Sequence, residues 1–169
     1  MMRMEVAAGE ERVLETAQYC DGRREDFMEN KIFYSPMERN HLVQVIALLQ
    51  NISEFLPGVD GHDEIWLRHS DQSNVFSIVA QQSDGFVVGF GTLLLESKIR
   101  GGKTGHIEDI VTHPDFRGLG IGRSIVESLT LLAGDEQCYK VTLHCKPHNT
   151  SFYEKSGFKI GGASMQKLL

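Results

Sequence analysis

The sequence predicts an α/β (α+β) fold, in which helices flank a mixed and mostly antiparallel sheet. In the first half, β-branched and apolar segments are joined by short turns, as in antiparallel hairpins. In the second half, a strand, a glycine-rich loop, an amphipathic helix and a second strand follow in order, which is typical of a crossover between parallel strands. The 169 residues suffice for one domain with one core, which we place at residues 31–169.

The N-terminal part of that domain is predicted to contain a strand and a helix. Residues 1–30 are charge-rich and weakly periodic, which predicts a tail or a marginal helix ahead of the domain. A first strand is expected at 32–34, closed by Pro36. A helix is expected at 41–51 because apolar residues recur there at helical spacing, and Asn40 is its predicted N-cap.

A second helix and a hairpin follow. The short helix is expected at 63–69, after a loop at 53–61. Strands at 75–81 and 86–96 are rich in Val, Ile, Phe and Leu, and the turn residues Ser-Asp-Gly at 83–85 separate them.

The remaining elements alternate between strand and helix. A basic, glycine-containing loop at 97–103 leads into them. In order they are strand 105–112, helix 119–133, strand 139–145, helix 149–155 and strand 158–167.

The composition is that of an ordinary globular chain, with 41% hydrophobic and 24% charged residues. The net charge of −6 argues against a nucleic-acid surface. No apolar run approaches the roughly 20 residues of a membrane span, and the N-terminus lacks the apolar core of a signal peptide. Cys20, Cys138 and Cys145 form no CxxC motif, so we expect reduced thiols in a cytoplasmic protein.

An arginine and three alternating glycines stand between strand 105–112 and the helix that follows, in the run Arg117-Gly118-Leu119-Gly120-Ile121-Gly122. Glycines let backbone N–H groups approach an anion, and a helix start adds unpaired N–H groups and a positive dipole end. The run therefore predicts a phosphate-binding loop. An ordinary glycine-rich turn between strand and helix is the alternative.

Two familiar phosphate loops do not fit this run. A P-loop needs Lys-Ser/Thr after its second glycine, whereas Gly122 is followed by Arg123-Ser124. A dinucleotide fingerprint needs a different last glycine spacing and an acidic residue about 20 positions further on. The pattern that fits is Arg-x-x-Gly-x-Gly, filled by Arg117, Gly120 and Gly122, which resembles the pyrophosphate loop of the GCN5-related N-acetyltransferase (GNAT) superfamily.

Three longer segments narrow this resemblance. Gly-His-Ile-Glu-Asp-Ile-Val at 105–111, Cys-Tyr-Lys-Val-Thr-Leu at 138–143 and Asn-Thr-Ser-Phe-Tyr-Glu-Lys-Ser-Gly-Phe at 149–158 are similar to the glucosamine-6-phosphate N-acetyltransferase family. The resemblance implies direct transfer of acetyl from acetyl-CoA to the 2-amino group of D-glucosamine 6-phosphate. The products would be CoA and N-acetylglucosamine 6-phosphate, a precursor of UDP-N-acetylglucosamine.

The resemblance also implies how acetyl-CoA is held. In the GNAT fold two central parallel strands, here 105–112 and 139–145, splay apart, and the opened backbone pairs with the pantetheine arm. A main-chain N–H, that of Ile110 or a neighbour, would polarise the thioester carbonyl. The residues that carry over as acetyl-CoA-binding are Ile110, Val111, Arg117, Gly118, Leu119, Gly120, Ile121, Gly122, Arg123, Asn149, Phe152, Tyr153 and Lys155.

Tyr153 is the first candidate for a catalytic residue. Acetyl transfer to an amine expels a thiolate, which benefits from a nearby proton donor, and a tyrosine hydroxyl can supply it. The family uses the tyrosine of this Phe-Tyr-Glu-Lys motif in that way, which implies Tyr153 here. The alternative is a core tyrosine that packs beside Phe152.

Glu108 and Asp109 are the other two candidates. Neighbours on a strand point to opposite faces, so the two carboxylates form no acid–base pair unless a bulge intervenes, and one should face the substrate. Two solvated strand carboxylates inside so apolar a run would be costly. In the family this segment binds substrate, which implies Glu108 for the amine proton, Asp109 for the hydroxyls or ammonium group, and Ile110 as a further contact.

The remaining substrate-binding candidates also come from the resemblance. Lys98 and Arg100 would bind the sugar phosphate, for which a lysine–arginine pair is well suited. Tyr139 and Lys140 would reach the substrate of the opposite subunit, which implies a homodimer with shared active sites. The alternatives are a basic solvated loop and a surface Tyr-Lys pair. Two looser matches complete the set, namely Ser53 and His144.

Two features of the sequence limit what can be inferred about a metal site and about how the substrate phosphate is bound. Histidines 106, 113, 144 and 148 show no metal-binding spacing, so no metal is expected. Leu168 stands where the family has an arginine that holds the substrate phosphate, and His144 replaces an acidic residue. Phosphate binding would then depend on Lys98, Arg100 and Lys140, or on the partner chain.

Two other functions stay open. A relative of the superfamily could acetylate another amine, such as a polyamine or a protein N-terminus, although the basic loop at 97–103 favours an anionic substrate. A non-catalytic acyl-CoA-binding module would keep Arg117, Gly120 and Gly122 but need not keep Tyr153 or Glu108.

Overall fold

The computed structural model describes residues 31–167. The predicted tail or helix at 1–30, Cys20 and the position of Leu168 lie outside the described residues.

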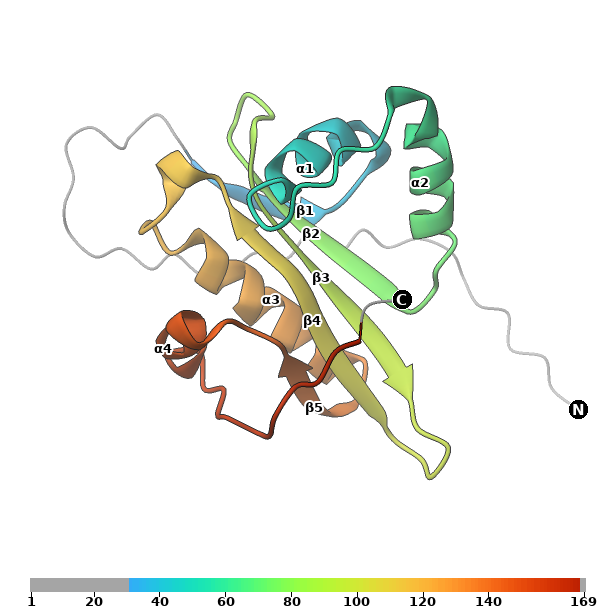
Figure 1. The fold of residues 1–169 in the computed structure, drawn as a ribbon, viewed down its shortest axis with the longest axis vertical. Coiled ribbons are helices and arrows are strands. Elements are labelled where there is room, and N and C mark those ends of the chain that lie inside the picture. The colour runs from blue at the N-terminus through green and yellow to red at the C-terminus, as the bar shows by residue number, and fades with distance from the viewer. Residues whose placement is uncertain (1–30, 168–169) are drawn as a thin grey trace, which may run out of the picture.

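Five strands form one sheet in the order β1-β2-β3-β4-β5. β1 to β4 pair antiparallel, and β5 runs parallel to β4 (Figure 1). This confirms the predicted mixed and mostly antiparallel sheet. The strands are β1 (Phe33–Pro36), β2 (Val75–Gln81), β3 (Val87–Ser97), β4 (Lys103–Thr112) and β5 (Cys138–Leu143).

All four predicted helices are present among residues 31–167. They are α1 (Leu42–Leu49), α2 (His62–Ser70), α3 (Ile121–Asp135) and α4 (Thr150–Glu154). The predicted cap of α1 is wrong, because Asn40 lies inside a 3₁₀ turn over Arg39–His41 that precedes the helix. In that turn the Glu38 N–H donates to His41 Nδ1 at 3.0 Å. Within the described range no helix has the length and apolarity needed to cross a bilayer.

The two faces of the sheet carry two apolar clusters, because side chains alternate along each strand. Leu93 and Ile107 point to one face, where they are buried against α3 together with Ile125 and Leu129. Phe90 is buried on the other face, in a cluster that α1 covers. The sheet is thus held between α1 and α3.

Two glycines of β3 let α3 approach the sheet closely. A Cβ at Gly89 would lie 2.8 Å from Ile121, and a Cβ at Gly91 would lie 2.7 Å from Ile125. Side chains at these positions would push the helix outward. The start of α3 is therefore fixed beside the middle of the sheet.

The predicted strand at 158–167 is wrong, since no strand is assigned there. Gly161 and Gly162 interrupt the segment, and its large apolar side chains Ile160 and Met165 are 79% and 95% exposed. A strand needs a partner and a surface on which alternate side chains pack, and this segment has neither among residues 31–167. β5 is therefore an edge strand and not a central one.

Candidate active site

The parallel strands β4 and β5 pair only over the first part of their length. Their last paired residues are Ile107 and Leu143. Beyond that pair a crevice of about 1160 Å³ opens between β4, the loop before α3 and the segment that leads to α4. The predicted separation of these two strands is thus present in the fold.

Most of the residues expected to hold acetyl-CoA line this crevice. The glycine-rich loop forms one end, and α4 contributes a wall opposite β4. The lining residues from the predicted set are Ile110, Val111, Arg117, Gly118, Gly120, Ile121, Gly122, Arg123, Asn149, Phe152, Tyr153 and Lys155. Leu119 is not among them, and its side chain is 46% exposed.

The glycine-rich loop has the backbone that only glycine adopts readily. Gly118 and Gly120 have φ values of 82° and 83°, in the left-handed region. Gly120 is the N-cap of α3 and offers no side chain to the first N–H groups of the helix, which have no partner inside it. A Cβ at either glycine would project into open space. The loop can therefore bring its amides up to an anion in the crevice.

A β-bulge separates Glu108 from Ile110. Thr92 pairs with Glu108 and Phe90 pairs with Val111, so Gly91 faces two residues of β4. Asp109 occupies the extra position with φ 58°, a conformation in which aspartate is more common than most residues. Both carboxylates line the crevice as a result. The sequence predicts that only one of the two carboxylates faces the substrate. That prediction holds for a regular strand, and the bulge explains why both carboxylates line the crevice here.

Two crevice side chains have shifted pKa values. Asp109 keeps much of its surface open to the crevice, yet desolvation by the surrounding protein raises the pKa of its carboxyl. Burial raises the pKa of the Tyr153 hydroxyl, and the neighbouring Cys145 and Glu108 raise it further. Asp109 is thus a better proton acceptor, and Tyr153 keeps its proton at neutral pH.

Tyr153 packs against other aromatic rings and also lines the crevice. Its ring packs edge-on against Phe152, with the ring centroids 4.8 Å apart, and against Phe158 at 6.2 Å. It still lines the crevice, close enough to Glu108 for that carboxylate to affect its pKa. The aromatic packing holds the hydroxyl in place.

The other substrate-binding candidates lie in three places. His144 lines the crevice, whereas Ser53 is an exposed loop residue outside it. The remaining candidates gather at the far end of the sheet, where Tyr139 packs beside Gly102 of the β3–β4 turn and Lys140 lies over the Tyr139 ring at 5.7 Å. The members of this distal group are Lys98, Arg100, Tyr139 and Lys140.

Several crevice residues were missed by the sequence analysis. Most of them lie in loops or short turns without regular periodicity, and two of these come from the segment that we expected to be a strand. Ile107 and Thr112 lie on β4. Cys145 directly follows His144 and is the one with a signal, since it extends a segment already singled out. The missed residues are Asn51, Ile52, Ile107, Thr112, Phe116, Cys145, Lys146, His148, Ser164 and Gln166. Among residues 31–167 no cluster of three His, Cys, Asp or Glu side chains could hold a metal ion.

The fold and the crevice define the class of protein. The sequence profile of the Acetyltransferase (GNAT) family matches residues 45–158. The split parallel strands and the glycine-rich loop at the start of α3 lie within this range. The chain belongs to the acetyltransferase (GNAT) family.

Within that family the chain is similar to glucosamine 6-phosphate N-acetyltransferases. It is 35% identical to the one from Candida albicans over 129 residues, which cover 75% of this chain and 85% of the relative. It is 38% identical to the one from Trypanosoma brucei brucei over 134 residues, 77% of this chain and 90% of the relative. The crystal structure of glucosamine-6-phosphate N-acetyltransferase from Arabidopsis thaliana is 28% identical, with a TM-score of 0.76 over 82% of this chain and 98% of that one.

Proposed function

We propose that this chain transfers the acetyl group of acetyl-CoA to the 2-amino group of glucosamine 6-phosphate. The observation that carries the proposal is the crevice, whose lining brings together the glycine-rich loop, two carboxylates and a half-buried tyrosine. The relatives of 35% and 38% identity with that activity support the choice of substrate. The product feeds the synthesis of UDP-N-acetylglucosamine, which we place in the cytoplasm.

Acetyl-CoA fits the crevice as the acetyl donor. Its pyrophosphate would lie on the amides of the glycine-rich loop and the start of α3, next to Arg117. Its pantetheine arm carries amide groups, which can pair with the free edge of β4 beyond Ile107. The thioester would then lie near Glu108, Asp109 and Tyr153.

The carboxylates prepare the amine for attack. The amino sugar binds largely as an ammonium ion, so it must lose one proton before its nitrogen attacks the thioester carbon. We assign this proton to Glu108, directly or through a water molecule, while Asp109 holds the ammonium group or the sugar hydroxyls. An amide N–H at Ile110 or its neighbour would stabilise the negative charge that develops on the carbonyl oxygen.

Tyr153 completes the transfer. The tetrahedral intermediate collapses with cleavage of the carbon–sulfur bond, and the electron pair leaves on the sulfur of CoA. The Tyr153 hydroxyl donates its proton to that sulfur. The nitrogen of the new amide releases its second proton to solvent, and Tyr153 regains a proton from the same solvent. The raised pKa of Tyr153 supports this role, because the hydroxyl stays protonated until a donor is needed.

We further propose that the active unit is a homodimer in which the distal group, Lys98, Arg100, Tyr139 and Lys140, completes the partner's site. These residues lie outside the crevice of their own chain. Uncovered apolar side chains occur on the same part of the protein and on the segment after α4, among them Ile99 and Met165. In the described part of the chain, β5 also pairs on one side only, and a second chain can cover its other edge.

The test is release of CoA thiol from acetyl-CoA with glucosamine 6-phosphate, glucosamine, spermidine or a peptide amine. We expect fast release with the phosphorylated sugar alone. Release with spermidine or the peptide instead would contradict the proposed substrate, while it would agree with membership of the acetyltransferase family. Tight binding of acetyl-CoA without release to any of the four would indicate a binding module.

A further inference from the structure

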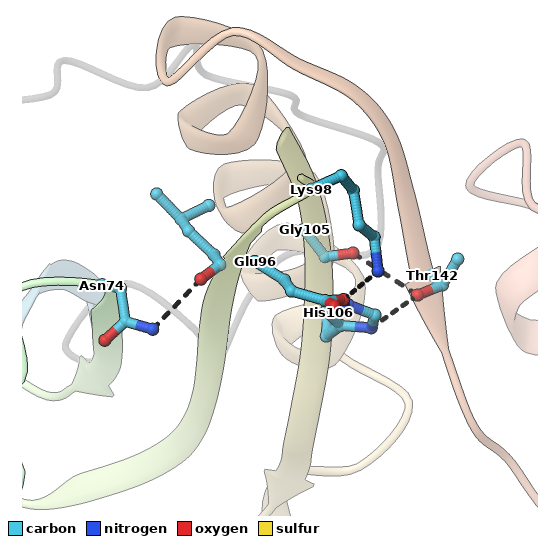
Figure 2. A network of polar contacts seen from close by, with 7 residues as sticks. Asn74, Glu96, Lys98, Gly105, His106 and Thr142 are labelled. Atoms are coloured by element: carbon cyan, nitrogen blue, oxygen red, sulfur yellow. Dashed lines mark hydrogen bonds and ion pairs between the residues drawn. The ribbon is translucent and has the colours of Figure 1, made fainter. Parts of the chain in front are cut away.

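Three side chains form a continuous hydrogen-bonded bridge across β3, β4 and β5 (Figure 2). Glu96 Oε2 lies 2.9 Å from His106 Nε2, and Thr142 Oγ1 lies 2.9 Å from His106 Nδ1. Both ring nitrogens of His106 are thus held by neighbouring strands. We call Glu96, His106 and Thr142 the strand bridge.

The bridge holds the imidazole in one orientation in either protonation state. A neutral ring with its proton on Nε2 donates to Glu96 and accepts from the Thr142 hydroxyl. A doubly protonated ring donates to both, and the hydroxyl can turn to the Gly105 carbonyl oxygen, 3.5 Å away. Lys98 makes a second ion pair with Glu96. Both ring nitrogens of His106 therefore keep a partner in either state.

The bridge stands directly before the point where β4 and β5 separate. His106 and Thr142 are a register pair, and the next pair, Ile107 and Leu143, is the last. Glu108 follows His106 by two residues and shares its face of the sheet, because the bulge comes only afterwards. The bridge thus fixes the last segment of β4 that is paired on both sides.

None of the three bridge residues lines the crevice. Within the crevice of the same chain, an effect of the bridge on the reaction would therefore pass through the backbone of β4 and β5. Displacement of a reacting group by about 1 Å can cost on the order of 10²-fold in rate, so a small change in the angle between the strands is sufficient.

We propose that His106 is a positioning residue for acetyl transfer. Held by Glu96 and Thr142, it sets the direction in which β4 and β5 diverge, and so the place of the Glu108 carboxylate relative to Tyr153. This inference rests on the role of Glu108 proposed above.

The test is a double-mutant cycle between Thr142→Val and Glu108→Gln. Valine has nearly the shape of threonine and suits a strand, so it removes one hydrogen bond of His106 with little change in packing. We expect Thr142→Val to lower kcat about 10-fold, with little change in KM for acetyl-CoA, and Thr142→Ser to restore kcat. In the Glu108→Gln background the same change should have no further effect, because residues that act through one another are not additive.

Thr130→Val is the matched control. Its hydroxyl donates to the Val126 carbonyl at 2.7 Å on α3, away from the crevice, so we expect kcat to stay unchanged. An equal loss of kcat from Thr142→Val in both backgrounds, or no loss in either, would overturn the proposal. A parent chain that releases no CoA would instead contradict the proposed function, which separates the two failures.

Discussion

The two halves of β4 differ in what surrounds them. Residues 103–107 pair with β3 on one side and β5 on the other, and Ile107 is 2% exposed. Residues 108–112 pair with β3 alone, contain the bulge, and turn both Glu108 and Asp109 toward the crevice. One continuous strand is thus core at one end and binding surface at the other.

The difference shows how this fold separates stability from chemistry. Pairing on both sides satisfies the backbone and leaves side chains to pack, so the first half contributes to stability. Loss of β5 as a partner frees backbone groups and space in the second half, which become available to a ligand. Substitutions near the second half should mainly affect the reaction, and substitutions of core residues near the first half should mainly affect unfolding. The strand bridge is the exception, because it lies in the first half and is proposed to act on the second.

The largest expected effect tests the crevice beside residues 108–112, the half of β4 that pairs with β3 alone. Tyr153→Phe removes the proton donor while keeping the ring that packs on Phe152 and Phe158. We expect kcat to fall by roughly 10²–10⁴-fold with nearly unchanged affinity for acetyl-CoA. Tyr34→Phe is the matched control, because Tyr34 packs on the same apolar cluster but lies away from the crevice. An unchanged kcat for Tyr153→Phe would remove Tyr153 from the mechanism.

The next effect tests the core around residues 103–107, the half of β4 that pairs with a strand on both sides. Leu93 is the register partner of Ile107 and is fully buried. Leu93→Ala should lower the free energy of unfolding by about 2–5 kcal/mol, because it removes packed atoms and leaves a cavity. Urea denaturation measures this, with Leu131→Ala, a change at a largely exposed residue of α3, as the comparison. A loss no greater than that of the Leu131 variant would argue against a core role for this half.

A third variant tests the glycine-rich loop, which follows residues 108–112 of β4 along the chain. Gly120→Val places a branched side chain where a Cβ projects into open space and φ is +83°. We expect about 10–100-fold weaker binding of acetyl-CoA, measured by calorimetry, because the loss of a charge-assisted phosphate contact costs about 1.5–3 kcal/mol.

Gly85→Val is its matched control. Gly85 has φ +85° and equally open surroundings, but it lies in the β2–β3 turn. The Gly85→Val variant has the same backbone strain at a position away from the proposed acetyl-CoA site. Its affinity for acetyl-CoA should therefore match that of the parent chain. Equal affinities for both variants would show that the loop around Gly120 is only a turn.

The smallest effect concerns pH. The raised pKa of Asp109 in the folded chain means that its charged form is less favourable there than in the unfolded chain. This cost is absent below the unfolded pKa of about 3.9, develops as the pH rises through it, and is complete above the folded pKa. Asp109→Asn should therefore raise Tm at pH 7 by roughly 1–2 °C and by less near pH 4.

The asparagine variant also tests function. Asparagine tolerates the left-handed backbone of the bulge, so activity should fall although stability rises. Thermal unfolding at both pH values, together with the rate of CoA release, measures the two effects. A lower Tm at pH 7 would mean that the Asp109 charge stabilises the fold.

Periodicity along the chain predicted most of the elements, because each helix and inner strand has a regular apolar side to bury. The segment at 158–167 failed since apolar residues alone do not form a strand without a neighbouring edge and a surface to cover. The bulge at Asp109 was considered only as a condition, because nothing local in Glu-Asp-Ile distinguishes a bulged strand from a regular one.

The candidate site was predictable where a motif stays together in the sequence. The loop from Arg117 to Gly122 and the segment around Tyr153 could be assigned in this way, and the structure brings both to the crevice. Asn51 and Ser164 also line the crevice, yet they come from distant loops whose approach depends on the finished fold. No spacing rule connects residues that meet only after the sheet has formed.

The backbone of Asp109 limits which residues can occupy this position. Its left-handed φ excludes β-branched residues, which clash there, and favours the short side chains of aspartate, asparagine and glycine. Glutamate would keep the charge but lacks this conformational preference, and glycine would keep the bend but lose the carboxylate. Backbone conformation and charge therefore both determine which residue can occupy this position in the crevice, and aspartate and glutamate are not interchangeable there.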